Sequence, residues 1–376
     1  MSAPTVVARP PRTPRSLVSR HPVLATAEVA VGMVLVGVGL GTGVPWAANV
    51  GLAPVTVASV LALVCGLALL VGGMWALAKR LGRGGRWLLV LATLATTLIV
   101  TYVVAVPVAV VAAPRADIGS RTPADQGLTF RSMQMPSRSG EVLAGWYVPT
   151  LNGAAVVLRH GSSASRTSVL DHAAVLARHG YGVLLTDARG HGMSTGRPMA
   201  WGWHGDDDVY AAIDVLKSTP GVDPSRIGVV GLSMGGEEAL GAAAFDQRIR
   251  AVVAESATGR SPADLGWLAT AYGWRGQMTL AVRTAQSALV DLISDASPPT
   301  SLGLAVSAMS PRPVLLVAAG EVADEQFAAR ALAANSTPNV HVWVVPGAGH
   351  TKGLQTAPQD WERRVVTFLD ESLQEG

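Results

Sequence analysis

The sequence predicts an α/β domain with a mostly parallel sheet, preceded by three transmembrane helices. Two observations carry this prediction. Three long uncharged stretches lie within residues 1–114, and apolar strand-like runs alternate with helical segments after residue 128. Hydrophobic residues make up 49% of the 376 positions and charged residues only 15%, which is too apolar for an ordinary soluble protein. We therefore divide the chain into a membrane domain (1–114), a linker (115–127) and an α/β domain (128–376).

The three uncharged stretches cover about residues 29–47, 55–77 and 87–113. Each is long enough to cross a hydrocarbon core of about 30 Å as a helix. A cleaved signal peptide is the alternative for the first stretch, but its apolar core is too long. Glycines inside this stretch would let a neighbouring helix pack closely against it: Gly37, Gly39, Gly41 and Gly43.

Basic residues predict the orientation of these helices, because loops rich in Lys and Arg stay in the cytoplasm. Four arginines precede the first stretch, and four basic residues separate the second from the third: Arg9, Arg12, Arg15, Arg20, Lys79, Arg80, Arg83 and Arg86. We therefore expect an integral protein of the plasma membrane, with a cytoplasmic N-terminus and an extracytoplasmic α/β domain.

The distribution of charge and cysteine excludes several classes of function. Residues 1–114 hold eight basic residues and one acid (+7), whereas residues 115–376 hold 21 basic and 25 acidic residues (−4). The α/β domain therefore has no basic excess for binding nucleic acid. Cys65 is the single cysteine, so an intrachain disulfide and a cysteine-based metal site are both excluded. We expect no metal site of any other kind and no cofactor.

The second half of the chain alternates between strands and helices in a way that predicts a sheet covered on both faces. Expected strands occupy 140–149, 154–158, 182–187 and 227–232, with others starting at 251, 313 and 340, and expected helices occupy 165–179, 206–218, 234–244 and 360–373. Residues 257–311 interrupt this rhythm with a helical stretch near 277–293 and an aromatic cluster. An insertion of that size predicts a helical cap over a site.

The pattern Gly-x-Ser-x-Gly occurs twice, as GMSTG (192–196) and GLSMG (231–235). A nucleophilic serine of this type requires a strand directly before it and a helix directly after it, because the tight turn between them exposes its Oγ. Ser233 meets both conditions, whereas Ser194 lies seven residues beyond its strand and is followed by loop residues. Ser233 is therefore the candidate nucleophile, and Ser194 is expected to be a structural turn residue.

The segments DARGHGMS (187–194) and PGVDPSRIGVVGLSMGG (220–236) together resemble the α/β-hydrolase superfamily, in particular its dienelactone-hydrolase and prolyl-oligopeptidase-like members. The resemblance covers about two-thirds of the chain. It implies an α/β-hydrolase fold with a helical cap, and a catalytic triad in the chain order serine, acid, histidine.

The resemblance also suggests which residues complete the triad. His350 lies in the loop PGAGHTKG, where the family places its general base, whereas His341 lies at the start of the last strand. The acid should follow the strand that begins at Pro313. Glu321, Asp324 and Glu325 lie nearby, and we favour Asp324, with Glu321 as the alternative.

An oxyanion hole needs two N–H donors that point at the developing negative charge. The resemblance assigns the backbone N–H of Met234 as the first donor. The loop RHGSSASR (159–166) would supply the second from Ser162, with Ser163 as a neighbour able to replace it. His160 is expected to brace this loop rather than to act as a base.

These residues predict a membrane-anchored serine hydrolase that cleaves an ester through an acyl-enzyme. The aromatic, apolar insertion suggests a small-molecule or lipid-like acyl substrate. Two alternatives stay open, namely a peptidase or amidase of the same fold and a non-catalytic binding protein built on it.

Overall fold

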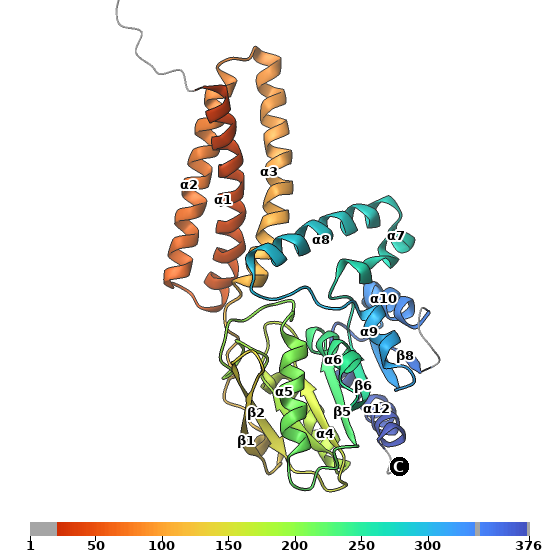
Figure 1. The fold of residues 1–376 in the computed structure, drawn as a ribbon. Helices are drawn as coiled ribbons and strands as arrows, with labels where there is room; N and C mark the ends of the chain where they lie inside the picture. Colours follow the sequence, from red (N-terminus) through yellow and green to blue (C-terminus); the bar gives the residue numbers. More distant parts are fainter. Residues whose placement is uncertain (1–20, 335–338, 374–376) are drawn as a thin grey trace, which may run out of the picture.

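The computed structural model describes residues 21–334 and 339–373, in which three long helices stand on an α/β domain (Figure 1). The long helices are α1 (Pro22–Asn49), α2 (Pro54–Ala78) and α3 (Arg83–Val111). Each is long and apolar enough to cross a membrane, with mean hydropathy values of 2.1, 2.5 and 2.3. The arginines Arg9, Arg12, Arg15 and Arg20, on which the predicted orientation partly depends, lie outside the described residues.

Glycines of α1 allow close packing in the helical bundle. A Cβ atom at Gly39 would lie 2.8 Å from the carbonyl oxygen of Ser59 in α2. A Cβ atom at Gly41 would lie 2.5 Å from the carbonyl oxygen of Ala105 in α3. Both separations are shorter than real Cβ contacts, so any larger residue would push the helices apart. The glycine-rich stretch of α1 therefore contacts both of its neighbours.

The α/β domain contains one eight-stranded sheet in the order β1-β2-β4-β3-β5-β6-β7-β8. The first two strands pair antiparallel with each other and with β4, and all other pairs are parallel. The strands are β1 (Arg131–Pro136), β2 (Val142–Val148), β3 (Ala155–Arg159), β4 (Gly182–Thr186), β5 (Ile227–Leu232), β6 (Ile249–Glu255), β7 (Val314–Ala319) and β8 (Val340–Val345). The sequence reading missed β1, an edge strand in which Met135 is fully buried but most other residues are exposed.

Helices cover both faces of the sheet, as the alternating pattern predicted. On one face α5 (Gly205–Lys217), α6 (Met234–Phe245), α9 (Leu302–Met309) and α10 (Ala323–Ala334) share an apolar core with the strands. On the other face the core is completed by α4 (Leu170–Arg178), the short α11 (Gly353–Thr356) and α12 (Pro358–Ser372). Helix α9 belongs to the predicted insertion, yet Leu302, Val306 and Met309 are fully buried in the main core.

The part of the predicted insertion that stands away from the sheet consists of α7 (Trp267–Tyr272) and α8 (Trp274–Ile293), which a 3₁₀ turn (Pro262–Leu265) precedes. Figure 1 shows α8 extending sideways between the bundle and the α/β domain. Loops that follow β4 contact the end of α3 and the linker, since Ala200 N–H donates to the Val110 carbonyl and Gly192 N–H to that of Ala116, both at 3.0 Å. The carboxyl ends of the central strands therefore lie on the bundle side of the domain.

Candidate active site

Ser233 occupies the sharp turn between β5 and α6. Its backbone angles are φ 52° and ψ −120°, a conformation that a non-glycine residue rarely adopts. Its N–H donates to the Glu255 carbonyl at 2.7 Å, which ties the turn to the neighbouring strand. The turn is possible because a Cβ at Gly231 would lie 2.1 Å from the Gly235 carbonyl oxygen, and a Cβ at Gly235 would lie 2.6 Å from that of His160. Both motif glycines are therefore sterically required.

His350 lies beside Ser233, on the loop after β8. Its Nε2 is 3.0 Å from Ser233 Oγ, and its Nδ1 is 2.6 Å from Glu325 Oε1. Because an ionised carboxylate can only accept, the proton is assigned to Nδ1, and Nε2 is left to accept the proton of the serine hydroxyl. The three side chains form a connected series with the geometry that activation of a nucleophilic serine requires.

The carboxylate at His350 is that of Glu325, which corrects the predicted placement of Asp324. The Asp324 side chain is exposed and accepts a hydrogen bond from the Tyr272 hydroxyl at 2.5 Å. Glu321, the predicted alternative, is also exposed. Glu325 is 1% exposed, and its second oxygen accepts from Ala319 N–H at 2.8 Å, at the end of β7. Consecutive helical residues point about 100° apart, so Asp324 and Glu325 cannot face the same histidine.

Helical spacing carried a signal for Glu325 that the sequence reading did not use. Positions three, four and seven residues after Glu325 are Ala328, Ala329 and Leu332, all of which are buried. That spacing places Glu325 on the inward face of α10. The signal is weak by itself, because Phe327 gives Asp324 an apolar neighbour three residues on.

The end of β6 holds the loop that carries His350, a contribution that sequence reasoning missed. Glu255 accepts hydrogen bonds from Gly353 N–H at 2.8 Å and from Trp361 Nε1 at 2.9 Å. Ser256, which has a φ of 60°, accepts through its Oγ from Thr351 N–H at 3.0 Å. These bonds fix the backbone on the C-terminal side of His350.

The loop after β3 lies against the serine. A Cβ at Gly161 would lie 3.3 Å from Ser233 Cβ, so the backbone at this position runs close to the serine. His160 is buried, and both of its ring nitrogens bond to backbone groups, Nδ1 to the Gly161 carbonyl at 2.7 Å and Nε2 to Ala188 N–H at 3.0 Å. Burial holds the pKa of His160 well below its usual value. His160 is therefore neutral and joins two loops.

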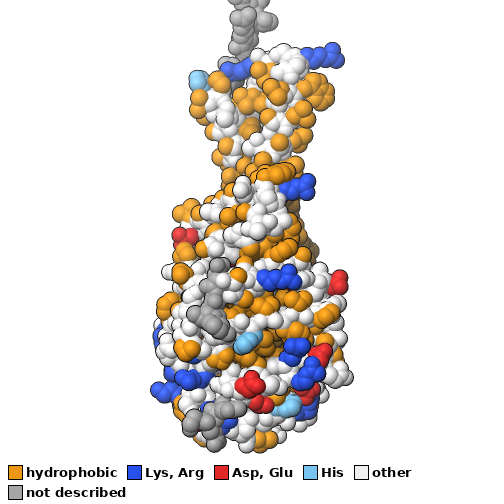
Figure 2. Space-filling model, turned by 90° about the vertical axis from the view of Figure 1, so that its right-hand side faces the viewer, with side chains coloured by type: hydrophobic (Ala, Val, Ile, Leu, Met, Phe, Trp, Pro, Cys, Tyr) orange, Lys and Arg blue, Asp and Glu red, His pale blue; other side chains and the backbone are white. Residues whose placement is uncertain are grey.

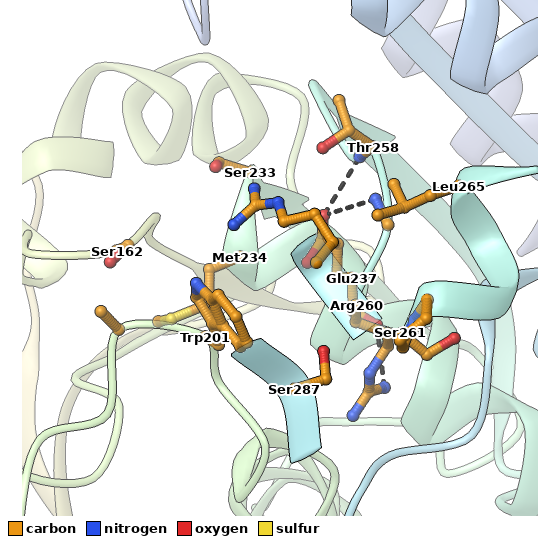
Figure 3. A pocket seen from close by; sticks show the side chains of 14 residues that line it. Ser162, Trp201, Ser233, Met234, Glu237, Thr258, Arg260, Ser261, Leu265 and Ser287 are labelled. Carbon is orange, nitrogen blue, oxygen red and sulfur yellow. Dashed lines mark hydrogen bonds between the residues drawn. The ribbon is translucent and has the colours of Figure 1, made fainter. Parts of the chain in front are cut away.

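Ser233 lines a cavity of about 190 Å³, together with Ser162 and Met234 (Figure 3). The loop after β6 contributes a polar wall, where Glu237 accepts from Thr258 N–H at 3.1 Å and from Gly259 N–H at 3.0 Å. Arg283 and Ser287 of α8 close another side, together with Trp201. The cavity therefore lies between α8 and the sharp turn that carries Ser233.

The second serine motif has no comparable surroundings. Ser194 is 1% exposed, and its Oγ donates to the Asp187 carbonyl and accepts from Ala144 N–H, both at 2.9 Å. The hydroxyl therefore links the loop after β4 to β2 and has no access to the cavity.

Hydrogen bonding and charge set the protonation of the site. The hydrogen bond to Glu325 raises the pKa of His350 above its usual value, and the negative charges of Glu325, Glu237 and Glu255 add to this effect. Burial favours neutral Glu325, but hydrogen bonds from His350 and Ala319 outweigh it and hold its pKa below the usual range. Within 21–334 and 339–373, no group of three His, Cys, Asp or Glu side chains is arranged to hold a metal ion.

Comparisons with known proteins agree with this fold. Residues 152–299 match the family model described as serine aminopeptidase, S33. An uncharacterized protein of Mycobacterium tuberculosis, Rv2307c, is 32% identical over 225 residues, which cover 58% of this chain and 72% of that protein. The thiohydrolase aneE of Aspergillus aculeatus is 34% identical over 132 residues, which cover 33% of this chain and 41% of that protein.

Solved structures share the fold of the α/β domain. The Pyrococcus furiosus esterase Pf2001 superimposes with a TM-score of 0.54 and 23% identity, and the match covers 69% of this chain and all of the esterase. The α/β hydrolase GrgF of a Penicillium species superimposes with a TM-score of 0.51 and 21% identity, covering 65% of this chain and 99% of GrgF.

Proposed function

The chain belongs to the α/β-hydrolase superfamily, and from that premise we propose that it is a membrane-anchored serine hydrolase that cleaves esters. The observation that carries the proposal is the series Ser233, His350 and Glu325, with successive separations of 3.0 and 2.6 Å. The esterase name of one structural neighbour and the thiohydrolase name of one relative support acyl chemistry.

In the proposed mechanism, Ser233 Oγ attacks the acyl carbonyl carbon while His350 Nε2 takes the hydroxyl proton. Glu325 stabilises the resulting imidazolium, which then protonates the leaving alcohol as the C–O bond breaks. Water then attacks the acyl carbon and gives a proton to His350. His350 returns this proton to Ser233 Oγ as the Oγ–acyl bond breaks, which releases the carboxylic acid and restores the serine hydroxyl.

Two backbone N–H groups are proposed as the oxyanion hole. Met234 is the first residue of α6, so its N–H has no acceptor within the helix. Ser162 lines the same cavity from the loop after β3, and Ser163 beside it has a φ of 55°. The helix N-terminus adds partial positive charge at the same point.

An active-site-directed fluorophosphonate tests the proposal on the full-length protein. The probe should label the wild type and the Ser194→Ala variant, and it should not label Ser233→Ala. An unlabelled wild type would support a non-catalytic binding protein, and labelling of Ser233→Ala would overturn the assignment. Matched aminoacyl ester and aminoacyl p-nitroanilide substrates then separate esterase from peptidase activity, which the family model's name keeps as the second candidate.

The membrane anchor is a separate part of the proposal. Its support is the length and hydropathy of α1, α2 and α3, and the many apolar side chains that the bundle exposes. In intact cells, an impermeant thiol reagent should react with a cysteine introduced at the exposed Leu151 on a Cys65→Ala background. Labelling only after lysis would reverse the proposed orientation.

A further inference from the structure

Helix α8 lies beside a helix that is proposed to span the membrane. The Gln286 side chain is buried, and its Nε2 donates to the Tyr102 carbonyl of α3 at 3.2 Å. Val290, one turn later, is also buried and belongs to the same apolar cluster as Val110 of α3. Tyr102 lies nine residues before Val111, the end of α3, which corresponds to about 14 Å along the helix axis. Helix α8 therefore contacts α3 well before the C-terminal end of α3.

The side of α8 that faces the α/β domain belongs to the candidate active site. Arg283 and Ser287 line the cavity that contains Ser233. The Arg283 guanidinium also lies over the Trp201 ring, 5.4 Å from its centroid. This side of the helix is polar and half-buried.

The opposite side of α8 is apolar along its whole length and exposed. Residues at intervals of four, three, four, three and four positions form a single stripe on this side. The stripe consists of Trp274, Met278, Ala281, Ala285, Ala288 and Leu292, all exposed. Ala288 lies at its edge, where it also lines a hollow together with Trp203 and Arg260. Its three large side chains are 65%, 59% and 78% exposed for Trp274, Met278 and Leu292 respectively. From Trp274 to Leu292, a separation of 18 positions, the stripe measures about 27 Å, which is too long and continuous for scattered surface residues.

We propose that this stripe lies in the lipid of the membrane that α1–α3 cross, in the leaflet nearest the α/β domain, and that the hydrolase takes its acyl substrate from that leaflet. The proposal rests on the proposed function and on the proposed anchor. Helix α8 would then be an interfacial helix with lipid on one side and the active-site cavity on the other.

Three observations favour lipid as the occupant of the stripe. The contact with α3 places α8 at a depth where the bundle itself would be surrounded by lipid. Apolar side chains are exposed both on the bundle and along the stripe, and Figure 2 shows hydrophobic side chains over the bundle and the adjoining part of the α/β domain, whereas most charged side chains lie farther from the bundle. At the start of the stripe, the Trp274 ring centroid lies 5.5 Å from Cζ of the Arg275 guanidinium. Tryptophan and arginine are typical anchors at a membrane surface.

The location of the stripe can be measured with single-cysteine variants of the full-length protein. On a Cys65→Ala background, cysteines at Met278, at Val64 of α2 and at Leu151 carry a bimane label in phosphatidylcholine nanodiscs with doxyl-labelled lipid. Val64 is exposed on the bundle, and Leu151 is 86% exposed on the α/β domain. We expect the doxyl lipid to quench bimane at Met278 and Val64 but not at Leu151.

The other outcomes are distinguishable. Quenching at Val64 but not at Met278 would overturn the lipid contact while leaving the anchor intact. Absence of quenching at both would overturn the anchor itself. Efficient bismaleimide crosslinking between two copies at Met278, in nanodiscs that admit two chains, would assign the stripe to a second copy of the protein instead.

A second experiment tests the source of the substrate. The double variant Met278→Asp/Leu292→Asp is compared with Leu151→Asp, which also replaces an exposed apolar side chain. Hydrolysis is measured on a soluble short-chain ester and on an ester lipid in phosphatidylcholine vesicles. We expect the ratio of vesicle to soluble activity to fall about tenfold or more in the double variant and to stay within about twofold in the control. An unchanged ratio in the double variant would refute uptake from the leaflet, whereas a wild type that hydrolyses neither substrate would refute the proposed hydrolase function itself.

Discussion

Two segments with the same five-residue pattern have contrasting surroundings in this domain. In GLSMG the serine has a positive φ of 52°, and its Oγ lies 3.0 Å from His350 Nε2. In GMSTG the serine is buried, and its hydroxyl bonds to two backbone groups. The glycines differ as well. Gly231 permits the sharp turn between β5 and α6. Gly192, with a φ of 47°, lies where a Cβ would be only 2.1 Å from the Asp187 carboxylate. The strand and helix that flank the pattern therefore determine whether its serine reaches the cavity.

Ser233→Ala should produce the largest difference between the two segments. Removal of the nucleophile is expected to lower kcat for a p-nitrophenyl ester by about 10⁴-fold or more. The melting temperature should change little, because the Oγ faces the cavity. If Ser233→Ala keeps more than a tenth of the wild-type activity, Ser233 is not the nucleophile.

Glu325→Gln should have the next largest effect on activity, because a neutral partner no longer orients His350 or stabilises its cation. We expect kcat to fall by about 10²–10⁴-fold. Asp324→Asn is the matched control at the adjacent residue and should change kcat less than about threefold, since Asp324 contacts Tyr272 instead. A reversed order of the two effects would restore Asp324 as the acid.

Glu325→Gln should also change the pH dependence of kcat/KM. His350 must be neutral to accept the serine proton, so kcat/KM should fall as the pH drops through its raised pKa. Glu325→Gln removes the group that raises this pKa, and the acid limb of the pH–rate profile should move to lower pH. If the acid limb has the same midpoint in Glu325→Gln as in the wild type, it reports the titration of a group other than His350.

Asp187→Ala should unfold the GMSTG loop rather than stop the chemistry. The buried Asp187 carboxylate accepts from Arg166 N–H at 2.8 Å, from Arg166 Nη1 at 2.9 Å and from Met193 N–H at 2.9 Å. Its loss leaves a buried guanidinium without its carboxylate and should cost about 3–5 kcal/mol of stability in chemical denaturation.

A control for this variant is Asp171→Ala, whose exposed ion pair with Arg121 should contribute less than about 1 kcal/mol. Equal effects of the two substitutions would mean that the buried loop is not a stabilising unit.

Ser194→Ala is the smallest change and the most direct test of the second motif. Two hydrogen bonds are lost at a buried position, and Ala144 N–H loses its acceptor, so stability should fall by about 1–3 kcal/mol. Fluorophosphonate labelling at permissive temperature should match the wild type. Loss of labelling in a folded Ser194→Ala protein would contradict a purely structural role.

Local sequence signals predicted much of the fold and part of the candidate site. The uncharged stretches correspond to α1, α2 and α3, and the apolar runs correspond to seven of the eight strands. The placement of Ser233 between a strand and a helix was readable because both neighbours lie within ten residues of it. His350 followed from its position in a glycine-rich loop after the last strand.

Contacts between distant segments were not readable in the same way. Asp324 and Glu325 are adjacent acids at the start of one helix, and the rotation of α10 against the sheet decides which of them meets His350. The supports from Glu255 and Ser256 join residues about 100 positions apart. Helix α9 lay inside the predicted insertion but completes the main core, because its buried face fits against α6 and the sheet.

By itself the sequence determined where the chain is apolar, where it alternates between strand and helix, and where a serine is placed on a sharp turn. These features depend on hydropathy, period and backbone sterics, all of which are local. The tertiary structure decided which carboxylate reaches His350, for which the sequence carried only a weak signal, and it alone placed α8 between α3 and the cavity. Both depend on the rotation and docking of helices against distant segments, which a local pattern does not specify.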